Sequence, residues 1–488
     1  MREKFSFLSL ASVVLALLVP VSTLARPQQT WQGIETSHFA IYTGSPNKDA
    51  GRDILNSLET ARIFFENSGL AAGTQGPQVN ILAFDSVRDA DIYRVNPAAY
   101  AFYQPTREGD FIVMPDLAPE HVPVAIHEYT HYVVEHAGLK LPLWLNEGLA
   151  DFYSTVESHN AQVILGAVPG GRENILGTQR WLDWADLAAV EHDSPYYRQA
   201  DKMLLFYSQS WAMVHMLALD ADYQGGFNRF LLAVSAGATT QQAMLAVYHK
   251  SLAQIGHDVQ AYVGSKRMTT RILNMDVRLP SLETEEIADA GRHVELALAE
   301  ILAASPQLAQ EGNSRLASLA MKYPADPSPE ESLGFQAMNA GRAQEAQQHF
   351  ALAVSHHSQN PEVWFRLAYL KFQSEGATEE VLDLLQRVVT ADKDHYGARL
   401  ELGFAAANSQ KYELAVKSLE GIRNVKPEHA YKVSYTLAYC AIKIQQGPKA
   451  RMYAEQARNV ASTNKDRDDV DCLLRYIDQK SLVQVASR

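Results

Sequence analysis

Two histidines stand four residues apart in this chain, with a glutamate directly after the first: His127-Glu128-Tyr129-Thr130-His131. On a helix, positions i and i+4 share one face, so both imidazoles can reach a single metal ion, at about 2.0–2.1 Å for zinc. Glu128 would then lie at the open metal position, where it can deprotonate a water whose pKa the zinc has lowered towards about 7. The pentapeptide alone equally fits an exposed polar helix face, so the decision depends on the residues downstream.

A carboxylate that can complete the site follows the second histidine after 15 intervening residues, at Glu147. A zinc hydrolase needs three protein ligands and an open fourth position, and Glu147 offers the third ligand from a second helix. Asp151 lies one turn further on the same face, where it can accept the other ring N–H of His127 and fix its tautomer. A solvated acidic face is disfavoured because apolar residues surround these two acids, namely Leu145, Leu149, Ala150 and Phe152.

The combined pattern, His-Glu-x-x-His followed by Asn-Glu-x-x-x-Asp, resembles that of the gluzincins, the thermolysin-like enzymes and large aminopeptidases. Residues 142–153, Pro-Leu-Trp-Leu-Asn-Glu-Gly-Leu-Ala-Asp-Phe-Tyr, are most similar to the peptidase MA-like proteins, exported bacterial proteins that often carry helical repeats. The resemblance covers roughly residues 30–270 and is strongest over 125–153. It implies zinc as the metal, His127, His131 and Glu147 as its ligands, and Glu128 as the general base.

The metzincin pattern does not fit. It would require a glycine at position 134 and a third histidine at position 137, where the chain has Val134 and Ala137. His136 is one position off and is expected at the surface. No Gly-x-Met-Glu-Asn segment precedes the metal helix, and the relatives that grip a free amine with that segment are aminopeptidases. Its absence favours an endopeptidase.

A hydrolase of this class also needs a donor for the oxyanion of its tetrahedral intermediate. The resemblance implies a tyrosine or histidine from a later helix. Tyr207, 60 residues after Glu147, is the candidate, with an ordinary core aromatic as the alternative. His215 is a weaker candidate, because a lone histidine on an apolar helix is usually satisfied by a neighbour.

The surrounding sequence predicts the elements that position these residues. Alternating or continuous apolar runs predict strands at residues 38–43, 79–84 and 110–114. Helical spacing predicts helices at 50–68, 119–137 and 142–153, and a mostly helical region up to about residue 270. This mixture predicts an α+β zincin-like catalytic domain at 30–275, followed by a helical connector at 276–330.

A repeat begins near residue 331. Leucine followed by a small residue recurs at spacings of 34, 35 and 35, and alanine or valine follows each leucine by 13 or 14 residues. The pattern resembles the tetratricopeptide repeat, in which small residues lie where paired helices touch and proline marks the turns. An unrelated helical bundle is the alternative. We therefore predict an all-α tetratricopeptide-type solenoid over residues 331–480 that binds a protein partner.

The N-terminus predicts export. A basic start at Arg2 and Lys4, an apolar run at residues 5–19 and small residues before a cleavage point after Ala25 make residues 1–25 a signal peptide, with a retained anchor as the alternative. No later segment is long and apolar enough to span a membrane. A net charge of -13 disfavours nucleic acid as a partner. Cys440 and Cys472 are expected to be buried thiols, with a disulfide between them as the alternative.

These observations predict an exported zinc-dependent peptidase, periplasmic or extracellular, that hydrolyses peptide or protein substrates. Glu128 and Tyr207 are its expected catalytic residues, and its repeats are expected to bind a protein partner. The alternative is a scaffold protein in which the repeats carry the function and the zinc domain is structural or inactive.

Overall fold

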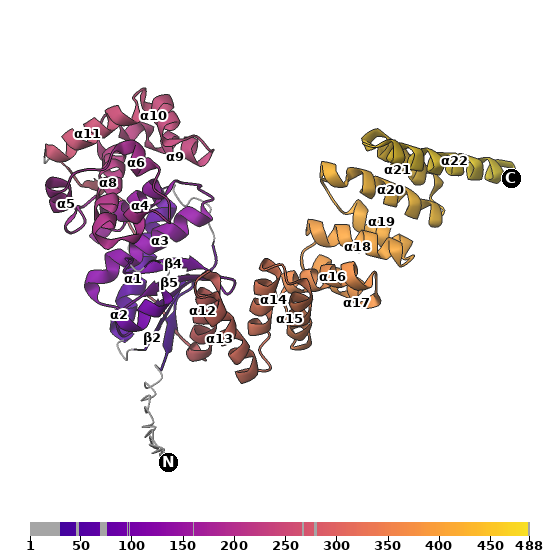
Figure 1. Cartoon of the computed structure of the whole chain (residues 1–488), viewed down its shortest axis with the longest axis horizontal. Coiled ribbons are helices and arrows are strands. Elements are labelled where there is room, and N and C mark those ends of the chain that lie inside the picture. The colour runs from indigo at the N-terminus through magenta and orange to yellow at the C-terminus, as the bar shows by residue number, and fades with distance from the viewer. Residues whose placement is uncertain are drawn as a thin grey trace, which may run out of the picture.

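The computed structural model describes residues 30–44, 48–68, 76–94, 96, 98–159, 161–265, 268–277 and 281–486. The predicted signal peptide at 1–25 lies outside the described residues. The chain begins with a unit of sheet and helices and continues as a row of paired helices that extends away from it (Figure 1).

A six-stranded sheet with the order β4-β5-β3-β2-β1-β9 forms the base of the first unit. Its centre is parallel, since β3 pairs with both β2 and β5 in parallel, and the outer pairings are antiparallel. The strands expected from the sequence are β2 (Phe39–Thr43), β3 (Val79–Ala83) and β5 (Asp110–Met114), and the other three are β1 (Gln32–Glu35), β4 (Phe102–Pro105) and β9 (Glu285–Ile287). β9 falls within the predicted connector, yet it pairs with β1.

Both faces of this sheet are covered, which explains why its central strands read as continuous apolar runs. Along β3, Ile81 packs in the cluster beneath α1 (Lys48–Ser68) and α3 (Val122–His136), whereas Leu82 packs against α12 (Ala290–Ala304) on the opposite face. The alternation of side chains along a strand sends neighbouring residues to these two layers. The sheet thereby gives α3, the helix with the two histidines, an apolar floor.

Two further helices hold α3 from the side that faces away from the sheet. The chain reverses at Gly138, whose φ of 67° is the left-handed conformation that glycine adopts without strain, and then enters α4 (Leu143–Tyr153). α4 packs closely on α8 (Ala200–Leu219). At Gly148 an added Cβ would lie 2.6 Å from the backbone oxygen of Ser210, so only glycine allows this approach.

The remaining elements of the first unit form short connections and an outer helical layer. They are α2 (Val87–Ala90), η1 (Asp91–Tyr93), η2 (Pro119–His121), α5 (Arg172–Thr178), α6 (Trp184–Ala188), α7 (Pro195–Arg198), η3 (Gln224–Gly226), α9 (Phe227–Ser235), α10 (Thr240–Tyr248) and α11 (Leu252–Gly264), with a small sheet of β6 (Glu157–His159), β7 (Gln162–Leu165) and β8 (Arg271–Leu273).

After α12 and α13 (Ala309–Lys322), the helices stack in antiparallel pairs, and each pair contacts the next (Figure 1). The pairs are α14 (Ser328–Asn339) with α15 (Ala343–Ser355), α16 (Pro361–Glu375) with α17 (Glu379–Ala391), α18 (Tyr396–Asn408) with α19 (Tyr412–Glu420), and α20 (Pro427–Lys443) with α21 (Gly447–Val460), followed by α22 (Asn464–Ala486).

The small residues of the repeat pattern lie inside these pairs. A Cβ on Gly334 would lie 2.5 Å from the ring of Phe350, and one on Gly403 would lie 2.4 Å from Leu419. The alanines and valine that follow at the next repeat position are fully buried, namely Ala346, Val381, Ala415 and Ala450. The 34- to 35-residue period of small residues in the sequence therefore arises from the positions at which the two helices of each pair touch.

The two cysteines differ in environment. Cys440 is a buried free thiol, as expected, but Cys472 on α22 is exposed, so the prediction that both are buried was wrong for this residue. Among the described residues, no helix has the length and apolar character that a membrane span requires.

Candidate metal centre

The two histidines of α3 lie on the face of the helix that meets α4. One turn of helix separates them, and their Nε2 atoms lie 3.2 Å apart. From α4, Glu147 directs its Oε2 atom to the same point, 3.3 Å from Nε2 of His127 and 3.5 Å from Nε2 of His131. The three residues form the one group of His, Cys, Asp and Glu side chains in the described part of the chain that could hold a metal ion.

The triangle formed by these three atoms has the size of a zinc site. Bonds of about 2.0–2.1 Å in a tetrahedral arrangement separate neighbouring ligand atoms by about 3.3 Å, which matches the sides of this triangle. Within the described structure, Oε2 of Glu147 is buried and has no hydrogen-bond partner. A buried carboxylate oxygen needs a cation or a donor, so the three side chains fit a zinc ion.

Each histidine also has a polar partner at its other ring nitrogen. Nδ1 of His127 lies 3.1 Å from Oδ1 of Asp151, and Nδ1 of His131 lies 3.2 Å from Oδ1 of Asn146. Both contacts leave Nε2 free to face the metal position. Sequence reasoning placed Asp151 beside His127 but missed Asn146, although it directly precedes Glu147 in the motif.

The carboxylates around the imidazoles make this place attractive to a cation. Burial lowers the pKa of His127, but the neighbouring carboxylates of Asp151 and Glu147 outweigh burial and raise the pKa to about 10. Burial raises the pKa of the Glu147 carboxyl, yet the imidazoles of His131 and His127 hold it far below its usual range. A positive charge, carried by a proton or a metal ion, is thus strongly favoured here.

Glu128, the predicted base, points from α3 into the space beside the two histidines. It is buried, and its Oε2 atom accepts a hydrogen bond of 2.9 Å from the backbone N–H of Tyr103 on β4. Burial is the main cause that raises the pKa of its carboxyl group. Two cavities of about 320 and 250 Å³ meet here, and both are lined by His127, Glu128 and Tyr207.

Tyr207, the predicted oxyanion donor, reaches this space from α8. Its ring centroid lies 6.0 Å from that of His127, and burial raises the pKa of its hydroxyl well above the usual value, so the group remains a donor. Two neighbours were not identified from the sequence. Tyr197 of α7 stacks on Tyr207 and donates its hydroxyl to Oε1 of Glu147 over 3.2 Å. Arg172 of α5 lies 2.6 Å from Asp151 and over the Tyr207 ring.

Of the other histidines, His192 lines the larger of the two cavities, whereas His215 and His136 line neither. His215 is buried, with Nε2 2.9 Å from the carbonyl oxygen of Gly166 and Nδ1 2.9 Å from the hydroxyl of Tyr262, and it lines neither cavity. His136, which was expected at the surface, is instead partly buried, with its Nε2 3.0 Å from Oδ2 of Asp110.

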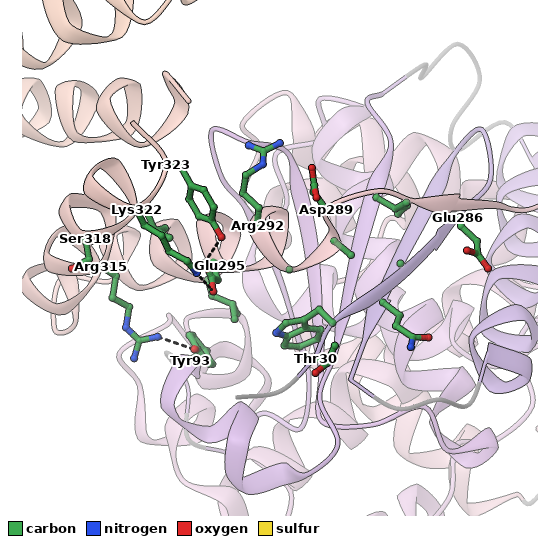
Figure 2. A pocket seen from close by; sticks show the side chains of 18 residues that line it. Thr30, Tyr93, Glu286, Asp289, Arg292, Glu295, Arg315, Ser318, Lys322 and Tyr323 are labelled. Carbon is green, nitrogen blue, oxygen red and sulfur yellow. Dashed lines mark hydrogen bonds and ion pairs between the residues drawn. The ribbon is translucent and has the colours of Figure 1, made fainter. Parts of the chain in front are cut away.

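A larger cavity, of about 1070 Å³, lies away from these residues, between the β1–β9 edge of the sheet and helices α12 and α13 (Figure 2). Its cationic side chains already have partners. Arg315 donates to the hydroxyl of Tyr93, and Lys322 contacts the carboxylate of Glu295. Arg292 pairs with Asp326. Of these contacts only that of Arg315 with Tyr93 reaches the sheet unit, while the two ion pairs join parts of the connector to each other.

No protein-family model matches the chain, and no curated protein matches it. Similar solved structures include YrrB, a tetratricopeptide-repeat protein described as having an unusual peptide-binding site (16% identity, TM-score 0.31, 36% of this chain and 88% of that chain). MamA (14%, 0.29, 34% and 91%) and PilF of Pseudomonas aeruginosa (17%, 0.26, 38% and 89%) are others.

Each of these matches spans little more than a third of this chain, and TM-scores below 0.5 carry no argument about function. The helix pairs themselves identify the C-terminal region. With a period of 34 to 35 residues and small residues at the contact within each pair, they form a solenoid of tetratricopeptide type.

Proposed function

We propose that this protein is a zinc-dependent peptidase with a zincin-like catalytic unit. The observation that carries the proposal is the convergence of His127, His131 and Glu147, whose ligand atoms lie 3.2 to 3.5 Å from one another. A structural zinc site is normally closed by four protein ligands, whereas three ligands beside a cavity are typical of a catalytic one.

A zinc ion bound there would act as a Lewis acid and lower the pKa of a neighbouring water. Glu128 lies beside the metal position with its carboxylate facing the cavity, so it can accept the proton of that water and later pass it to the leaving amine. The Tyr207 hydroxyl can donate to the oxyanion that forms on the substrate. Tyr197 holds Glu147 through its other oxygen and supports the Tyr207 ring.

Two observations favour a peptide as substrate. β4 is an edge strand of the sheet and lines the cavity with Phe102, Tyr103 and Gln104, so an extended chain can lie beside it, although the Tyr103 N–H is already bonded to Glu128. Cavities lie on both sides of Glu128, which leaves room for substrate residues before and after the cleaved bond. This arrangement favours an endopeptidase over an aminopeptidase.

The test is Glu128→Gln in the full-length protein. We expect stoichiometric zinc by elemental analysis, because no ligand is altered, together with a loss of cleavage of a denatured protein substrate by at least about a hundredfold. Glu120→Gln, an exposed glutamate just before α3, is the matched control and should cleave like the wild type. The assignment would be refuted if the wild type cleaved at its normal rate in the presence of a chelator and Glu128→Gln cleaved as fast as the wild type.

The second candidate is a scaffold whose repeats bind a protein while the metal unit is structural. The solenoid supports it, because stacked helix pairs present a long continuous surface to partners. The zinc-loaded wild type would then bind its partner but cleave no substrate, and Glu128→Gln would change neither property.

We also propose that the protein is exported, on the basis of residues 1–25. N-terminal sequencing of the mature protein should begin at Arg26. A retained residue 1 would contradict cleavage of the signal.

A further inference from the structure

The β4–β5 hairpin connects the metal centre to the first helix pair of the solenoid. β4 runs past Glu128, and four residues form the tip before β5, with Thr106 N–H donating to the Gly109 carbonyl across the turn over 2.8 Å. At about 3.3 Å per residue, the tip lies only about 13 Å along the strand from Tyr103. A displacement of the tip can therefore move Tyr103.

The strands of the hairpin are fixed to α3. The backbone N–H of Tyr103 donates to Glu128, and its hydroxyl donates to Asp110 on β5. The other oxygen of Asp110 lies 3.0 Å from Nε2 of His136, the last residue of α3. Asp110 is buried, so this contact is shielded from water. β4 and α3, the helix that carries His127 and His131, are thus joined at two points: directly through Glu128, and by way of Asp110 through His136.

The tip of the hairpin is fixed to the connector and the first repeat. Arg107 forms an ion pair with Glu331 of α14 and lies 4.6 Å from the ring centroid of Phe335 on the same helix. The backbone N–H of Glu108 donates to Oε2 of Glu300 on α12 over 3.1 Å. The hairpin tip therefore contacts two helices that belong to neither the sheet nor the metal centre.

The two acceptor carboxylates are themselves held by the repeats. Glu331 accepts hydrogen bonds from the Ser358 hydroxyl (2.5 Å) and the Asn360 side-chain amide (3.1 Å), which lie between α15 and α16. Glu300 accepts the Ser332 hydroxyl of α14. Both glutamates are buried, at 5% and 4% exposure. Buried charges with several partners keep a fixed geometry, because moving one leaves the others unpaired.

We propose that Arg107 and Glu331 are positioning residues, through which the first repeat fixes the edge strand β4 against Glu128. This inference rests on the proposed function of the metal centre. The Tyr103–Glu128 distance is 2.9 Å, so a displacement of roughly 0.6 Å would take it beyond hydrogen-bond range. Loss of that bond leaves the Glu128 carboxylate free to rotate, and its alignment with the water it deprotonates suffers.

The test compares Arg107→Ala with Arg315→Ala in the full-length, zinc-loaded protein. Arg315 also joins the two parts of the molecule, through the Tyr93 hydroxyl, but it does not touch the hairpin. Hydrogen exchange of the Tyr103 amide is the first measurement. We expect it to accelerate by about tenfold or more in Arg107→Ala, because a bond to a charged acceptor is lost, and to stay unchanged in Arg315→Ala.

Kinetics and zinc affinity are the second pair of measurements. Arg107→Ala should lower kcat, per zinc-loaded molecule, by about tenfold with little change in KM, because only the alignment of Glu128 is affected. Zinc affinity should stay within about twofold, because no ligand or ligand partner changes. Arg107→Lys, which keeps the positive charge, should recover part of kcat.

Glu331→Gln provides an independent variant if Arg107→Ala folds poorly, because it keeps an acceptor oxygen for Ser358 while removing the charge and the acceptor oxygen that face Arg107 and Asn360. Tyr103 amide exchange that stays at the wild-type rate in both Arg107→Ala and Glu331→Gln overturns this inference, whatever the turnover. Equal acceleration in Arg315→Ala overturns it as well. A wild type with zinc but no turnover is a different result, which refutes the proposed function.

Discussion

Replacing Asp151 by asparagine tests how the polar surroundings support the metal centre. One oxygen of Asp151 lies 3.1 Å from Nδ1 of His127, and the other lies 2.6 Å from the guanidinium of Arg172. Asparagine keeps the size of the side chain and can still accept a hydrogen bond from His127. It removes the negative charge, however, and turns an amide NH2 towards Arg172.

The expected magnitude follows from these two contacts. Loss of a carboxylate that orients a metal-bound histidine typically weakens metal binding by about 10- to 100-fold, which corresponds to about 1.4–2.7 kcal/mol. Arg172 also loses its ion-pair partner while its side chain is only 15% exposed. Leaving this charge without a partner should lower the free energy of unfolding by roughly 1–3 kcal/mol, with or without zinc.

Zinc affinity is measured by competition with a chromophoric chelator at fixed pH, and stability by thermal unfolding with and without zinc. Asp258→Asn is the control, because Asp258 also pairs with a cation, Lys250, but lies on the surface of the outer helical layer. Zinc affinity of Asp151→Asn within twofold of the wild type would refute the role assigned to this carboxylate.

Three further predictions concern other parts of the molecule. Gly148→Ala should lower the free energy of unfolding by about 2 kcal/mol, because its Cβ would meet a backbone carbonyl of α8. Gly177→Ala is the control and should leave stability unchanged, because its Cβ would meet nothing within 4 Å. Equal denaturant midpoints of the two variants would contradict this prediction. Burial raises the pKa of Glu108 to about 7, so the folded chain keeps a proton that the unfolded chain loses above about pH 4.5. The resulting stability is complete below pH 4.5 and falls as the pH rises through 7, and Glu108→Gln should remove that fall; parallel stability profiles would count against it. Cys472 should be alkylated in the native protein, whereas burial raises the pKa of Cys440 to about 11 and should protect it until unfolding, as peptide mass spectrometry can show.

The parts of the metal centre that were predictable are those set by helical geometry alone. His127 and His131 need only one helix, and Glu147 and Asp151 need only a second helix that returns along the first. Tyr197 was not predictable, because it lies on α7, an element of four residues whose position depends on tertiary packing. Arg172 begins a helix of seven residues and was missed for the same reason.

The elements of the fold likewise divide into those that a local sequence pattern predicts and those that depend on tertiary packing. The central strands are covered on both faces, and their apolar runs identified them. The edge strand β4 is only four residues long, is half-buried and ends in Pro105, so it lacks a periodic signal. Its place is determined by pairing with β5. Cys472 was misjudged because the pattern of a helix does not reveal how many neighbours cover it, and α22 packs mainly on α21 and α20.

The stacking of the helix pairs has a consequence for how this chain loses its structure. In the described structure each pair packs mainly on its neighbours along the row, and the innermost pair, α14 with α15, is also tied to the sheet unit through Arg107. Stability in such an array is a sum of local terms and nearest-neighbour couplings, so the array need not open as a whole. The outer pairs can unfold and refold while the sheet unit remains intact, and thermal unfolding should then proceed in steps. A single melting temperature would describe this protein poorly, because the metal centre and the far end of the solenoid belong to different cooperative units.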